Sequence, residues 1–90
     1  MISTKGRYAL RLMADLAQGE PGKSISLRDV AERQQISVKY LEAVTAPLVR
    51  AGLVASRMGK NGGYRLTRAP EEYTVREIIL AALTFIRPCA

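Results

Sequence analysis

Two serine-capped helices with almost no chain between them constrain the fold more than any other feature of this sequence. Ser26 precedes an apolar pattern that predicts a short helix over residues 27–34, and Ser37 precedes a second pattern over residues 38–51. The tight connection between them is Gln34-Gln35-Ile36. A short helix, a brief turn and a second helix at a steep angle make a helix-turn-helix, so the sequence predicts this motif.

The remaining segments predict one helix before this motif, and a hairpin and a helix after it. Tyr8, Leu12 and Leu16 recur at helical spacing, so a first helix is expected from a Ser3 cap to about Gln18. The later elements are strands over residues 53–57 and 64–66 around a tip at 58–63, and a helix from the capping box Thr74-Val75-Arg76-Glu77 to about Phe85. Together they predict one domain over residues 1–90, mainly α with a small β-hairpin, which is a winged helix-turn-helix.

Pro47 lies inside the longer predicted helix and violates a local rule. Proline removes an amide donor and crowds the preceding turn, so we expect a kink or a break into two segments there. Gly52 lies where a helix commonly ends in a left-handed residue.

The positive charge is concentrated in the middle of the chain. Lys and Arg number 14 against 8 Asp and Glu, a net charge of +6. Residues 37–68 hold six basic residues and only Glu42 as an acid, so they contribute 6 − 1 = +5. A basic surface of this kind indicates an anionic partner. With no His, one Cys and no clustered carboxylates beyond Glu71-Glu72, the sequence offers no catalytic set, so an enzyme is not expected.

The first turn of the helix after Ser37 carries polar and charged side chains. In a helix-turn-helix the second helix enters the major groove of DNA with its N-terminal end. Ser and Lys side chains can contact phosphates or base edges, and Glu can accept from a cytosine amino group. The candidate residues are Ser37, Val38, Lys39, Tyr40 and Glu42.

The hairpin tip combines cations with glycines. Glycine allows the backbone to approach a surface closely, so such a tip suits a phosphate backbone or a narrow minor groove. Asn61-Gly62 alone also predicts an ordinary hairpin turn, but that does not explain the extra glycines and cations. The residues are Arg57, Gly59, Lys60, Asn61, Gly62, Gly63 and Arg65.

Four segments resemble the IscR-type family of bacterial winged helix-turn-helix transcription regulators. They are STKGRYAL at residues 3–10, SVKYLEAV at 37–44, AGLV at 51–54 and GGYRL at 62–66. The resemblance covers essentially the whole chain. It implies a homodimer that binds a near-palindromic site on double-stranded DNA, with the helix at 37–51 in the major groove and the hairpin at 57–65 on the backbone or minor groove.

The resemblance also implies roles for individual residues. Ser37, Lys39, Tyr40 and Glu42 match recognition-helix positions. Lys5, Arg7 and Tyr8 match a motif that lies near the DNA backbone in the family. Arg28, in the first turn of the short helix, is a further candidate for DNA contact.

The hairpin departs from the family pattern at one position. The family has Arg where this chain has Met58, and Arg57 stands one place earlier. Adjacent strand residues face opposite sides, so Arg57 is not an automatic substitute. The sequence therefore does not decide whether the hairpin inserts into the minor groove. Arg57 or Lys60 is expected to supply, by a different route, the positive charge that Met58 lacks.

The end of the chain also departs from the family, which continues into a long dimerisation helix and, in some members, three cysteines. Only Cys89 is present here, and one thiolate cannot hold an iron–sulfur cluster that needs about three or four protein ligands. No cofactor is therefore expected in this chain. The segment 75–86 is apolar on nearly every face, so we expect it to meet a second subunit on one side.

A winged-helix module that binds protein without DNA is the alternative function. The apolar segment 75–86 would then be its docking surface. Neither a signal peptide nor an apolar run of about 18 residues is present, so a cytoplasmic protein with no membrane partner is expected.

Overall fold

The predicted helix-turn-helix is present as two capped helices in the computed structural model, which describes residues 4–19, 23–59 and 62–83. Helix α2 (Leu27–Gln34) begins where the Ser26 hydroxyl accepts from the Asp29 amide at 3.2 Å. Helix α3 (Val38–Arg50) begins where the Ser37 hydroxyl accepts from the Tyr40 amide at 3.0 Å. The turn between them is tight because Gln35 adopts left-handed backbone angles, with φ of 58°.

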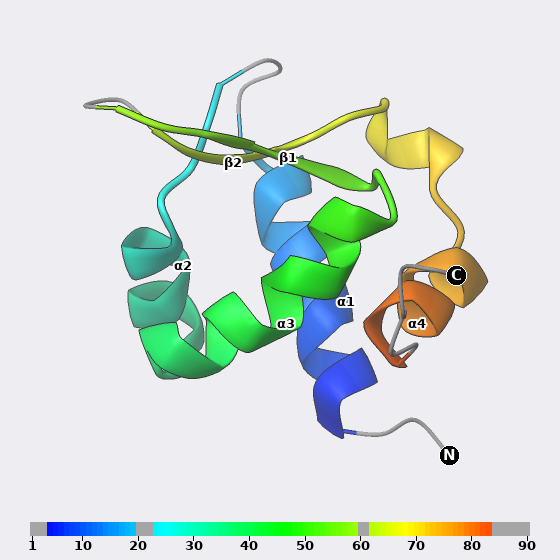
Figure 1. Cartoon of the computed structure of the whole chain (residues 1–90), viewed down its shortest axis with the longest axis horizontal. Coiled ribbons are helices and arrows are strands. Elements are labelled where there is room, and N and C mark those ends of the chain that lie inside the picture. Colours follow the sequence, from blue (N-terminus) through cyan, green and yellow to red (C-terminus); the bar gives the residue numbers. More distant parts are fainter. Residues whose placement is uncertain (1–3, 20–22, 60–61, 84–90) are drawn as a thin grey trace.

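The core lies between these helices, α1 (Thr4–Ala17) and α4 (Val75–Leu83). Figure 1 shows α3 crossing in front of α1, with α4 at one end of the molecule and the hairpin above the helices. The apolar stripes of the helices meet there, as their spacing predicts. Its largest fully buried apolar side chains are Leu12, Val30, Leu41, Val44, Leu48 and Val54.

A two-stranded antiparallel hairpin covers this core. Strand β1 (Val54–Arg57) pairs with β2 (Gly63–Leu66), with Val54 opposite Leu66 and Arg57 opposite Gly63. The predicted hairpin is therefore confirmed. Ile25, just before α2, adds a short bridge to Tyr64 through two backbone hydrogen bonds of 2.8 Å. This bridge ties the helix-turn-helix to the hairpin, and the sequence pattern did not indicate it.

Helix α3 runs without interruption through Pro47, so the predicted break into two segments is wrong. Pro47 removes one donor only, and the amide of Ala51 still donates to the Pro47 carbonyl at 3.0 Å. The ring of Pro47 is buried, and tertiary packing of this face outweighs the lost bond. The helix ends before Gly52, whose φ is +80°, as predicted.

The segment before α4 holds one element that the sequence analysis missed. It is a short 3-10 helix, η1 (Pro70–Glu72). The capping box that follows is complete: the Thr74 amide donates to the Glu77 carboxylate at 2.9 Å, and the Glu77 amide donates to the Thr74 hydroxyl at 3.1 Å.

Helix α4 buries one face and exposes another. Ile78 and Ala82 are buried, whereas Val75 and Leu83 are about half exposed, at 58% and 48%. An apolar helix face left in solvent is unusual for a monomer. In the described part of the chain, no helix is long and apolar enough to cross a membrane.

Some predicted features lie outside the described residues. They are the Ser3 cap, Lys60 and Asn61 at the hairpin tip, and the end of the chain from residue 84, with Phe85 and Cys89.

Candidate nucleic-acid interface

The first turn of α3 presents its polar side chains to solvent. Ser37, Lys39 and Glu42 are exposed, as expected, and Val38 is exposed to 38%. Leu41, between them, is fully buried and anchors the turn in the core. The helix thus holds its exposed residues on a rigid support, which a surface that reads base edges requires.

Tyr40 has a packing role that the sequence analysis did not foresee. Its ring lies edge-on to the ring of Tyr8 in α1, with centroids 5.4 Å apart and planes at 82°. Aromatic pairs prefer this arrangement. The contact brings the N-terminal half of α1 beside the first turn of α3.

Three basic residues lie on this part of α1, and Arg11 is the one whose contact with Tyr8 places it beside this surface. Arg7 is exposed, Lys5 is half-buried, and the guanidinium of Arg11 lies 5.3 Å from the centroid of the Tyr8 ring. Arg11 was not among the sequence candidates. Its position four residues after Arg7, on the same helix face, is the signal that could have found it.

The hairpin carries its exposed cation at the end of β1. Arg57 is exposed, and Met58 beside it is exposed to 91%. Lys60 and Asn61 fall outside the described residues, so the structure gives only part of the predicted cationic tip. Arg28, at the start of α2, is also exposed.

Two of the three hairpin glycines, Gly62 and Gly63, have a structural reason beyond close approach to a ligand. A Cβ on Gly63 would overlap the Ile25 carbonyl oxygen, and one on Gly62 would overlap the Arg57 carbonyl oxygen. Gly63 also has a φ of +148°, which disfavours other residues. These glycines let the hairpin turn and let Ile25 pair with β2.

The start of α3 and the described part of the hairpin nearest its tip lie toward the same end of the molecule's longest axis. In Figure 1 the start of α3 lies at the lower left and the ends of β1 and β2 nearest the tip lie at the upper left, with α2 between them, whereas α4 lies at the right. The sequence analysis assigned these elements to one surface, and that surface stays a prediction. The same arrangement leaves α4 away from that surface.

Two other arginines are engaged within the protein. Arg33 donates to Asp15 of α1 at 2.6 and 3.2 Å, and Gln34 donates to the same carboxylate at 3.0 Å. These hydrogen bonds hold the pKa of Asp15 below its ordinary value, although burial opposes the shift. Arg68 pairs with Glu77 of α4 at 3.0 and 3.3 Å. Both pairs join elements of the fold.

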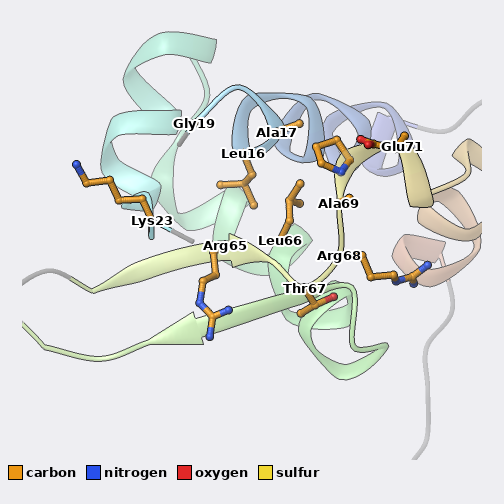
Figure 2. Close-up of a pocket in the computed structure, with 11 residues that line it drawn as sticks. Leu16, Ala17, Gly19, Lys23, Arg65, Leu66, Thr67, Arg68, Ala69 and Glu71 are labelled. Atoms are coloured by element: carbon orange, nitrogen blue, oxygen red, sulfur yellow. The ribbon is translucent and has the colours of Figure 1, made fainter. Parts of the chain in front are cut away.

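A groove in the described part of the chain is lined by both apolar and charged residues. It has a volume of about 420 Å³ and lies between the end of α1 and β2. Figure 2 shows Leu16 and Leu66 directed into it, whereas Arg65 extends to the opposite side of β2. Successive strand residues face opposite sides, so Leu66 and Arg65 cannot both line it with their side chains.

Comparison with known proteins gives a family for this arrangement. The family model Rrf2, described as an iron-dependent transcriptional regulator, matches residues 2–84. The regulator IscR of Aliivibrio salmonicida is 45% identical over 80 residues, which cover 89% of this chain and 48% of that protein. This chain spans about half the length of the curated relatives it matches.

Solved structures agree with the fold. CymR (YrzC), the global cysteine regulator of B. subtilis, has a TM-score of 0.88 and 36% identity, over 100% of this chain and 74% of that one. IscR of T. potens has a TM-score of 0.85 and 42% identity, over 97% of this chain and 64% of that one. The mainly α winged helix-turn-helix with a small hairpin is therefore confirmed.

The residues present do not fit an iron–sulfur cluster, a cofactor that the family's iron dependence suggests. The sequence has one Cys and no His. Among residues 4–19, 23–59 and 62–83, no group of three possible metal ligands comes together. A cluster needs about three or four protein ligands, which these residues do not supply.

Proposed function

This chain belongs to the Rrf2 family of transcriptional regulators, and from that premise we propose that it binds specific sites on double-stranded DNA. The family is one of regulators rather than enzymes. One observation carries the proposal: the exposed first turn of α3 and the basic hairpin lie toward the same end of the molecule.

In the proposed complex, the first turn of α3 lies in the major groove. Lys39 and Glu42 are exposed on a helix whose buried Leu41 fixes its position, so they are placed to read base edges. Ser37 and Tyr40 contact the backbone or the groove wall. Because Tyr40 of α3 packs on Tyr8 of α1, α1 comes close to the DNA when α3 lies in the groove.

The other cations contact the DNA backbone on either side of α3. Phosphate contacts fix the register of a protein on the duplex without reading sequence. We assign this role to Lys5, Arg7, Arg11, Arg28, Arg57, Lys60 and Asn61, and place Gly62 and Gly63 where the hairpin backbone comes closest to the duplex. The hairpin thus lies on the backbone or in the minor groove.

We propose further that the protein acts as a homodimer in the cytoplasm, where bacterial DNA lies. The exposed apolar face of α4, with Val75 and Leu83, supports a second subunit there. It lies at the far end from the hairpin tip, so a partner on α4 leaves the proposed DNA surface accessible. A two-fold dimer would read a near-palindromic site.

The test is a titration of duplex DNA at two salt concentrations, after selection of a preferred site from random duplexes. Binding through phosphates weakens steeply with salt. Lys39→Ala and Glu42→Ala should change which sequences are preferred, whereas Arg57→Ala should weaken all sequences alike. Undetectable binding, or binding insensitive to salt, would refute the proposal.

The exposed face of α4 also supports a second candidate, a module that binds a different protein and no DNA. It predicts a complex through α4 in light scattering and no shift of any duplex. The same titration separates the two functions, because only a DNA regulator responds to Lys39→Ala.

A further inference from the structure

One tyrosine hydroxyl closes the base of the hairpin. Tyr73 donates to the Leu53 carbonyl at 2.8 Å, and its oxygen accepts from the Thr67 and Arg68 amides at 2.8 and 2.9 Å. A phenolic hydroxyl has one donor and two acceptor positions, so all are in use. Leu53 directly precedes β1, whereas Thr67 and Arg68 follow β2. The hydroxyl therefore holds both strands at their open end.

A second contact reinforces this end. The Thr67 hydroxyl donates to the Gly52 carbonyl at 2.8 Å, at the end of α3. The base of the hairpin is thus fixed to the helix that carries the proposed recognition residues. Toward the tip, the described residues hold the hairpin through the Ile25–Tyr64 bridge and through a turn bond of 3.0 Å from the Gly62 amide to the Gly59 carbonyl.

Arg68 connects Tyr73 to α4. Its guanidinium lies 4.7 Å from the centroid of the Tyr73 ring and makes a two-pronged pair with Glu77, at 3.0 and 3.3 Å. It also donates to the Glu72 carbonyl at 3.2 Å. Glu77 is itself fixed by the capping box that begins α4. Figure 1 shows the open end of the hairpin beside η1 and toward α4.

We propose that Tyr73 and Arg68 are positioning residues that set the direction of the hairpin relative to α3 and α4, and so deliver Arg57 to DNA. This inference rests on the proposed function. A hairpin of four-residue strands has little stability of its own. Its direction is therefore set by its attachments to the rest of the fold: the Ile25–Tyr64 bridge on β2 and, at the open end, the hold that passes through Tyr73 to the first turn of α4.

The first test measures the free protein by hydrogen exchange in Tyr73→Phe. This change removes the hydroxyl and keeps the ring. We expect faster exchange at the amides of Thr67 and Arg68 and along β1 and β2, with α1 unchanged. Unchanged exchange in the hairpin would overturn the inference. This result does not depend on DNA, so it stands apart from a failure of the proposed function.

The second test is a double-mutant cycle on DNA affinity with Arg57→Ala and Tyr73→Phe. Arg57→Ala should weaken the wild type about tenfold, the usual effect of losing a charged hydrogen bond. In Tyr73→Phe the same change should cost about twofold or less, because a misdirected hairpin no longer delivers Arg57. Full additivity, or an Arg57→Ala variant that binds as the wild type does, would overturn the inference.

A matched control separates direction from loss of stability. Asp15→Asn removes an ion pair between α1 and α2, away from the hairpin base. It should destabilise the fold while Arg57→Ala keeps its full effect in that background. Arg68→Met should behave as Tyr73→Phe does. If Asp15→Asn also suppressed the Arg57 effect, general stability would be the cause and the positioning role would be wrong.

Discussion

Asp15 is the buried charge on which the contact between α1 and α2 depends. It accepts three hydrogen bonds, from Arg33 and Gln34, and is 9% exposed. Asp15→Asn should lower the free energy of unfolding by about 1.5 kcal/mol, because it removes charged hydrogen bonds. Urea unfolding at neutral pH measures this. Glu71→Gln, on exposed η1, is the control and should match the wild type.

The same residue makes stability depend on pH. The pKa of Asp15 is lowered in the folded state from its ordinary value of 3.8, by its hydrogen bonds to Arg33 first and Gln34 after. The ionised form therefore favours folding. Its contribution is fully present above the ordinary value and is lost as the pH falls through the lower folded value. Asp15→Asn should flatten the acid limb of the stability curve, and an unchanged limb would contradict this.

Gly63 occupies a backbone position that glycine fits and other residues do not. Gly63→Ala would force its Cβ onto the Ile25 carbonyl oxygen and strain a φ of +148°. We expect a loss of about 2 kcal/mol in the free energy of unfolding, measured by thermal or urea unfolding. Gly59→Ala is the matched control, since its φ is +109° but its Cβ would meet open space. Equal losses for both would refute the overlap argument.

The exposure of some single residues could be predicted from the sequence, whereas some of their contacts could not. The exposure of Lys39 and Glu42 follows from helical spacing, because Leu41 between them must face the core. The Tyr8–Tyr40 contact joins residues distant in the sequence, and no local pattern encodes that distance. The same is true of the Tyr73 hydroxyl, whose bonds to the Leu53 carbonyl and to the Thr67 and Arg68 amides are made with backbone groups that carry no signature in the side chains.

At the scale of elements, the caps allow a prediction that separates folding from binding. Ser26 and Ser37 make the same bond at the starts of α2 and α3. Replacing either by Ala should cost about 1 kcal/mol of stability. Ser37→Ala should weaken DNA binding more than Ser26→Ala does, because it frays the turn that enters the groove, whereas Ser26→Ala disturbs only the proposed phosphate contact of Arg28. Unfolding curves and duplex titrations of both variants check this, and equal losses of affinity would contradict it.

Element boundaries were predictable where a local rule decides them. Ser26, Ser37 and the Thr74–Glu77 box satisfy helix amides within one turn, so the starts of the later helices could be read from the sequence. At Pro47 the sequence predicted a kink or a break, and the break is absent because the local rule counts the lost donor and not the buried face of α3. The Ile25–Tyr64 bridge could not be predicted from local rules either, because only the packed fold brings these two residues together.

At the scale of the whole molecule, the order of elements predicts the winged helix-turn-helix, because a helix-turn-helix followed by a hairpin is that fold. The candidate site on it stays a prediction. The sequence could not show that the hairpin base is held by the segment leading into α4. That link depends on the path of residues 67–77, which no periodicity reveals.

The exposed apolar residues of α4 lead to a prediction about self-association. Leu83 is 48% exposed on α4, at the end opposite the hairpin tip. In a two-fold dimer each change acts twice, so Leu83→Arg should weaken self-association at least about tenfold, judged from the value of burying one leucine. Sedimentation velocity measures this, with Met58→Arg as the control, since Met58 is 91% exposed but lies on the hairpin.

A near-palindromic duplex should then bind Leu83→Arg in two weak steps in place of one tight step, because each subunit still carries an intact reading surface and only their linkage is lost. Wild-type protein that stays monomeric, or a Leu83→Arg variant that dimerises as the wild type does, would remove α4 as the interface and leave the DNA surface unaffected.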